Sequence, residues 1–107
     1  MITLINIAKK IGIENQSSIR VILSNYSMDK LFDTLPKVIT DESNSEKYIF
    51  DLKIYNLVSY ELRYIKNDKD SLFRLTGIDL RQVLINAIIE VIKLKLNFTK
   101  YRCNNEF

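Results

Sequence analysis

The sequence predicts an α+β fold in which an N-terminal helical part precedes a small antiparallel sheet and a long C-terminal helix. Apolar residues recur at helical spacing in residues 1–35, and they alternate with polar residues through much of 37–76. Residues 79–98 combine helical spacing with an apolar surface on most sides. With 107 residues, two glycines and one proline, the chain is expected to form a single domain, residues 1–107, of long regular elements.

The first part of the chain is expected to hold three short helices. Thr3–Ile11 places its apolar side chains on one face, with Thr3 as a possible N-cap and Gly12 as a natural end. A second helix is predicted over Gln16–Tyr26. After a serine-containing cap, a third short helix is predicted over Lys30–Leu35, where the following proline stops it.

The middle of the chain is predicted to form strands. Lys37–Thr40 is a short strand candidate, and the acidic, serine-rich segment 41–47 is expected to be a loop. Apolar and polar residues then alternate over 48–65, with a break near Asn56, as they do in half-buried antiparallel strands. A helical interpretation stays open, because four apolar residues of this segment, spaced from Ile54 to Ile65, also share a helical face. Residues 71–76 can return as a partner strand after a turn at 67–70.

The long helix predicted over Asp79–Phe98, with Asp79 as its cap, carries two apolar stripes beside a narrow polar one. One stripe consists of Leu80, Leu84, Ile88 and Val91, and the other consists of Ile85, Ile89, Ile92 and Leu96. We expect one stripe to pack on the chain's own sheet and helices and the other to meet a second copy of the chain or a larger protein. The predicted interface is the stripe formed by Ile85, Ile89, Ile92 and Leu96. Residues 99–107 are expected to form a basic tail.

The residue inventory argues against an enzyme. Histidine is absent, which removes the commonest general base and the commonest metal ligand. The single cysteine, Cys103, completes neither an ordinary zinc site nor an intramolecular disulfide. Neither glycine lies in a phosphate-binding loop, and the acidic clusters fall in predicted turns, where solvated acids are common. We therefore expect no catalytic residue, no cofactor and no bound metal.

The sequence predicts that the protein is located in the reducing cytoplasm. The lone cysteine agrees with a reducing compartment, and the N-terminus lacks the features of a signal peptide. The longest apolar run is interrupted by charged and amide residues, so no membrane partner is expected. The net charge of +3 includes four cations without an intervening acid, which suit either a phosphate backbone or a solvated helix end: Lys93, Lys95, Lys100 and Arg102.

Residues 4–23 (LINIAKKIGIENQSSIRVIL) resemble the helix-turn-helix family of DNA-binding domains. Ala8 and Gly12 have the separation that this family shows between the helix crossing and the turn. Ile19 and Ile22 match the buried positions of the second helix. The segment ENQSS is about one residue longer than the tightest turn of the family. The resemblance extends to the winged-helix variety, in which 37–40 and 48–54 would be the strands and 41–47 the wing.

The resemblance implies that the helix from Gln16 onward is a recognition helix whose N-terminal residues face the major groove of DNA. The nucleic-acid-binding residues expected on this basis, together with the basic tail, are Asn15, Gln16, Ser17, Ser18, Arg20, Lys100 and Arg102. The same residues can equally cap and solvate a helix that binds nothing. Two features argue against routine DNA binding: the wing would carry Asp41, Glu42 and Glu46, and the recognition helix offers Arg20 as its one cation.

These observations favour a small non-enzymatic nucleic-acid-associated protein that acts in transcription regulation or replication, dimeric through its C-terminal helix. The alternative is a protein-binding accessory subunit or inhibitor, which docks on a larger enzyme, such as a nucleic-acid-processing one, without reading DNA itself. In that alternative, the tyrosines of the predicted strands would join the contact: Tyr55, Tyr60 and Tyr64.

Overall fold

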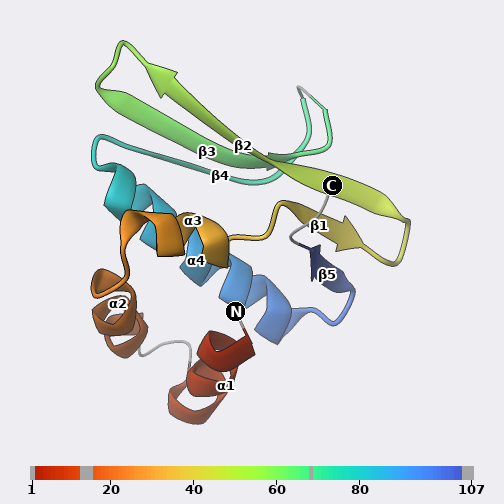
Figure 1. Ribbon diagram of the computed structural model, residues 1–107. Coiled ribbons are helices and arrows are strands. Elements are labelled where there is room, and N and C mark those ends of the chain that lie inside the picture. Colours follow the sequence, from red (N-terminus) through yellow and green to blue (C-terminus); the bar gives the residue numbers. More distant parts are fainter. Residues whose placement is uncertain (1, 13–15, 68, 105–107) are drawn as a thin grey trace.

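The computed structural model describes residues 2–12, 16–67 and 69–104, and these form four helices and one five-stranded antiparallel sheet (Figure 1). The helices are α1 (Ile2–Ile11), α2 (Gln16–Ser24), α3 (Met28–Thr34) and α4 (Leu80–Asn97). The strands are β1 (Val38–Asp41), β2 (Glu46–Tyr55), β3 (Ser59–Ile65), β4 (Ser71–Gly77) and β5 (Tyr101–Asn104). The α+β class is confirmed, and residues 48–65 are strands joined by a turn rather than a helix. The winged-helix arrangement is not confirmed, because the two strands expected beside the wing belong to this larger sheet.

The strand order is β4-β3-β2-β1-β5, so the first four strands form a meander and the last strand pairs with the free edge of β1. The prediction of a basic tail is therefore wrong over residues 101–104. The four residues of β5 are too few to show a clear alternation. Their strand conformation depends on pairing with β1. Just before β1, the Lys37 amide donates one more hydrogen bond, of 2.8 Å, to the Asn104 carbonyl at the end of β5.

Local signals explain several element boundaries. Ser27 caps α3, because its hydroxyl accepts the Lys30 amide hydrogen bond at 3.1 Å, and Asp79 caps α4 by accepting from the amides of Arg81 and Gln82. Gly12 follows α1 in the left-handed conformation, with φ of 80°, that glycine adopts without strain. Thr3 lies within α1 and not at its N-cap. None of the described helices has both the length and the apolar composition needed to cross a membrane.

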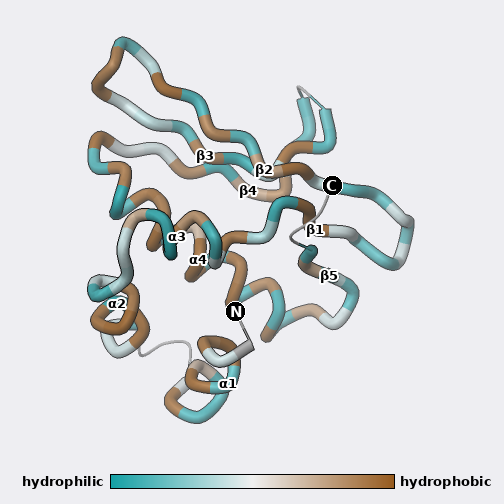
Figure 2. The backbone as a smooth tube through the Cα atoms, viewed as in Figure 1, coloured by the Kyte–Doolittle hydropathy of each residue, from teal (hydrophilic) through white to brown (hydrophobic). Residues whose placement is uncertain are grey.

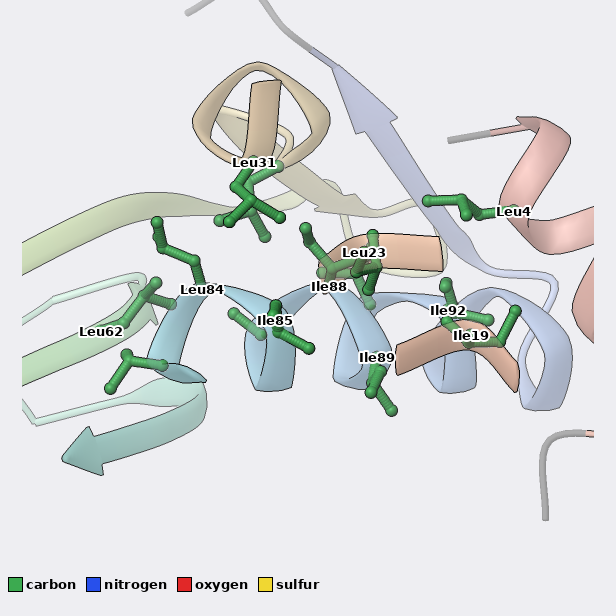
Figure 3. Close-up of a cluster of buried hydrophobic side chains, with 14 of the residues drawn as sticks. Leu4, Ile19, Leu23, Leu31, Leu62, Leu84, Ile85, Ile88, Ile89 and Ile92 are labelled. Atoms are coloured by element: carbon green, nitrogen blue, oxygen red, sulfur yellow. The ribbon is translucent and has the colours of Figure 1, made fainter. Parts of the chain in front are cut away.

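Helix α4 is the centre of the hydrophobic core. It lies between the sheet and the helices α1 and α2 (Figure 1), and it contacts α3 as well. Eight of its side chains are buried, and Leu4 of α1, Ile19 and Leu23 of α2, and Leu31 of α3 meet them (Figure 3). A helix with apolar residues on most sides is stable in water only when it is covered on most sides, and here the chain provides that cover itself.

The prediction that one apolar stripe of α4 is free to meet a partner is wrong, because that stripe is buried. Ile85 and Ile89 are each 2% exposed and Ile92 is fully buried, all within the core of a single chain. Leu96 is half-buried and packs against the same core. The three short N-terminal helices account for the difference, because they cover the parts of α4 that the sheet leaves open (Figure 3).

Candidate nucleic-acid interface on the open face of the sheet

Helix α2, the expected recognition helix, turns its one cation toward the protein. The Arg20 guanidinium is half-buried, and its Nη1 donates a 2.7 Å hydrogen bond to Oδ1 of Asn86 on α4. Gln16 and Ser18 are half-buried, whereas Ser17 is exposed; Asn15 lies outside the described residues. Arg20 therefore joins α2 to α4, and the exposed side of α2 around Val21 is uncharged.

The two cations expected in the basic tail lie near β5, and their environments differ. The Lys100 Nζ is 3.2 Å from Oδ2 of Asp41, and this contact raises the pKa of the ammonium group. A side-chain hydrogen bond from Ser43, together with Lys100, lowers the pKa of the Asp41 carboxyl. Arg102 is exposed on β5. Lys100 therefore forms an ion pair with Asp41, whereas the Arg102 side chain is accessible to solvent and to a ligand.

The sheet has one covered face and one open face. Residues of the inner face contribute to the core around α4, whereas alternate residues point to the outer face, over which no described helix lies (Figure 1). The charged strand residues on the outer face comprise five cations and two acids: Lys47, Lys53, Arg63, Arg74 and Arg102, and Asp51 and Glu61. We call this surface the outer face.

Both acids of the outer face are already neutralised. Arg63 Nη2 lies 2.9 Å from Asp51 Oδ2, and Arg63 Nε lies 3.2 Å from Glu61 Oε1. Arg74 Nη2 lies 2.7 Å from the other oxygen of Glu61, whose side chain is buried. The hydrogen bond to Asp51 is the main cause that raises the pKa of the Arg63 guanidinium. Three cations of this face have no carboxylate partner among the described residues: Lys47, Lys53 and Arg102.

The acidic segment between β1 and β2 is less negative than its sequence suggests. Asp41 pairs with Lys100, and the Glu46 carboxylate lies 3.6 Å from Nζ of Lys66 at the end of β3. Of the three acids, this leaves Glu42, which is exposed. The expected repulsion between this segment and phosphate is correspondingly smaller.

The β2–β3 hairpin ends in apolar residues (brown at the β2–β3 turn in Figure 2), and their side chains are exposed. Leu57 is 90% exposed. Ile78 is 83% exposed and follows Gly77, which pairs with Tyr60 close to the turn of the hairpin. We define the hairpin tip as this group of residues: Ile54, Tyr55, Leu57, Val58 and Ile78.

The backbone of this turn is unusual. Asn56 and Leu57 have positive φ angles of 53° and 62°, and the Val58 amide donates a 3.1 Å hydrogen bond to the Tyr55 carbonyl. Positive φ at both central residues is the mark of a type I′ turn, which favours glycine at the second of them. A leucine at this position has a strained backbone, and its apolar side chain is exposed to solvent.

The three tyrosines expected at a protein contact are not equivalent. Tyr55 is exposed and lies on the outer face, Tyr60 is half-buried, and Tyr64 is fully buried in the core. The Tyr64 hydroxyl donates a 2.6 Å hydrogen bond to the Pro36 carbonyl, and burial raises the pKa of this hydroxyl. The expectation of a contact is therefore wrong for Tyr64.

The sequence missed Lys47 and Lys53 as site residues. Each sits at an alternate position of β2, so the period-two pattern places both on the same face as Asp51. Which face stays open depends on where the helices pack, and this is not a local property. Within residues 2–12, 16–67 and 69–104, no three potential metal ligands of the His, Cys, Asp and Glu types come together. Comparison with protein-family models, curated proteins and solved structures found no match for this chain.

Proposed function

We propose that the protein binds single-stranded nucleic acid on the outer face of its sheet and acts as a non-enzymatic accessory factor in transcription regulation or replication. The observation that supports this proposal is the surplus of cations on an uncovered sheet face whose two acids are already paired. Lys47, Lys53 and Arg102 are available to neutralise phosphates.

Single strands suit this surface better than a duplex does. Proteins that bind single strands combine a basic surface with aromatic side chains on which bases stack. Tyr55 is exposed on the outer face two residues from Lys53, so a base and a phosphate could be held by one strand of the sheet. A recognition helix fits into the major groove of a duplex, whereas a broad sheet face does not.

The helix-turn-helix resemblance makes duplex DNA the competing ligand, through Gln16, Ser17 and Ser18 within a winged-helix-like arrangement. Helix α2 offers no exposed cation for this task, because Arg20 is bound to Asn86. For this reason we favour the outer face over α2.

The decisive experiment measures fluorescence anisotropy of a labelled oligothymidylate of about 12 nucleotides, and of a duplex, over a range of salt concentrations. The test variant replaces Lys53 and Arg102 by glutamine. The matched control replaces Lys9 and Lys10, which are exposed on α1, in the same way.

The test variant is expected to weaken single-strand binding, and to reduce the slope of log K against log salt by about 1.4, because two phosphate contacts are lost. The control is expected to keep most of the wild-type affinity. No binding of the single strand by the wild type, or equal loss in both variants, would contradict the proposal. Preference for the duplex together with loss of binding in Ser17→Ala would instead support α2.

The hairpin tip favours a second candidate function, a protein-binding accessory role. A strained leucine that is 90% exposed contributes little to the fold, so its apolar side chain is free to meet a partner. Light scattering over a range of concentrations tests the simplest form, contact with a second copy. Replacement of Leu57 and Ile78 by serine should then turn an associating wild type into a monomer, whereas a wild type that is itself monomeric would contradict this form.

A further inference from the structure

Three side chains form a row across strands β2, β1 and β5 on the outer face. Thr40 pairs with Lys47 of β2 on one side and with Arg102 of β5 on the other. Directly opposed residues of an antiparallel pair project to the same face, with Cβ atoms about 5 Å apart. Ile39, the neighbour of Thr40, belongs to the core on the other face, which fixes the direction of the row. A neutral hydroxyl thus lies between two cations.

The hydroxyl of Thr40 is unusual in being buried without a partner. Thr40 is 5% exposed, and its Oγ1 is the single buried side-chain nitrogen or oxygen atom in the described part of the chain that makes no hydrogen bond. Buried polar groups are nearly always paired, because an unpaired one has lost water without gaining a replacement. A valine of similar shape would avoid this cost, so the hydroxyl is expected to have a ligand.

The row has the donors that a phosphate group needs. A hydroxyl, an ammonium group and a guanidinium group all donate hydrogen bonds, and the planar guanidinium matches two phosphate oxygens at once. Neither Lys47 nor Arg102 has a carboxylate partner among the residues described. Asp41, the nearest acid along β1, alternates to the inner side and is paired with Lys100, while Glu42 lies in the turn.

We propose that Lys47, Thr40 and Arg102 form a phosphate-binding site. This inference rests on the proposed function, which it deepens: the row holds one backbone phosphate of the bound strand at the β1 side of the sheet. In the free protein the side chains of Lys47 and Arg102 flank Thr40 on its two neighbouring strands. Both are long and exposed, and they can move aside and close on the phosphate as it docks.

The test compares Thr40→Val, Thr40→Ser and Thr76→Val. The first removes the hydroxyl at nearly constant shape, and the second keeps a hydroxyl at the same place. The third makes the same change at an exposed threonine of the outer face on β4, away from the row. Each variant is measured by anisotropy with the labelled oligothymidylate, by thermal unfolding without ligand, and by competition with inorganic pyrophosphate.

Thr40→Val is expected to weaken oligothymidylate binding roughly tenfold, because a hydrogen bond to a charged group is lost, and to raise the melting temperature of the free protein, because an unpaired buried hydroxyl is removed. Thr40→Ser should keep the wild-type affinity within about threefold, and Thr76→Val should change neither quantity. A role in folding alone would not combine higher stability with weaker binding.

The outcomes separate this inference from the proposed function. If Thr40→Val binds the oligothymidylate as the wild type does, the phosphate site is refuted, while an effect of the Lys53 and Arg102 replacements would still support the outer face. If the wild type binds pyrophosphate but no oligothymidylate, and Thr40→Val loses the pyrophosphate, the site serves a free phosphate compound and the proposed function fails. If the wild type binds neither, both fail.

Discussion

Replacing Leu57 by glycine is expected to stabilise the protein. Leu57 occupies the second central position of the turn between β2 and β3, with φ of 62°, where an L-residue with a Cβ atom is strained. Its side chain is 90% exposed, so its removal sacrifices almost no buried apolar surface. The substitution also produces the Asn-Gly pair that type I′ turns favour.

The size of the effect follows from two opposing contributions. The left-handed conformation costs a non-glycine residue roughly 1–2 kcal/mol, which glycine avoids. Glycine in turn loses about 0.5–1 kcal/mol more than other residues through its greater freedom in the unfolded chain. The free energy of unfolding should therefore rise by about 0.5–1 kcal/mol, and the melting temperature by about 2–6 °C.

Thermal unfolding followed by far-UV circular dichroism measures this change, and Leu57→Ala is the matched control. Alanine removes the same exposed apolar atoms but keeps the Cβ atom and its strain, so its melting temperature should stay close to that of the wild type. An equal gain in both variants would trace the effect to the lost apolar surface. A lower melting temperature for Leu57→Gly would refute the strain argument itself.

Three further predictions concern contacts between elements. Arg20→Ala should lower the free energy of unfolding by about 1–2 kcal/mol, because the half-buried amide of Asn86 loses its charged partner. Urea unfolding of Arg20→Ala, Asn86→Ala and the double variant measures this loss, and strictly additive losses in the double variant would contradict the argument. Tyr64→Phe should cost about 1–3 kcal/mol, because the Pro36 carbonyl loses a buried donor, and an unchanged melting temperature would show that the bond contributes nothing. The lowered pKa of Asp41 stabilises the fold above its unfolded pKa of about 3.9, and this contribution disappears as the pH falls through the lower folded value. The melting temperature of the wild type should therefore exceed that of Asp41→Asn near neutral pH and converge with it in acid, and a difference that persists down to about pH 2 would argue against this assignment.

The features predicted correctly are those that depend on neighbouring residues. Ser27 and Asp79 cap their helices through side chains that reach amides two or three residues ahead, and Pro36 follows the end of α3. The period-two alternation identified β2 and β3 because each residue's face is set by its position in the strand. Such signals do not require knowledge of the rest of the fold.

The features predicted wrongly depend on residues far apart in the sequence. The stripe around Ile89 looked like surplus apolar surface, because periodicity cannot show that three short helices will cover it. The prediction that Arg20 contacts DNA, which remains a prediction, could not take account of its hydrogen bond to Asn86, because that partner lies 66 positions away. The candidate site on the outer face likewise required the strand register, which brings Lys47 and Arg102 together on either side of β1.

The pairing of β5 with β1 has a consequence for how the chain folds. The strands β1 to β4 are linked by short turns, so each can find its partner by closing a small loop. The last strand reaches β1 only after α4 has crossed from one edge of the sheet to the other. Such non-local pairing is slow to form, so β1 should complete its hydrogen bonds late. During refolding, the amides of β3 should then become protected from hydrogen exchange before those of β5.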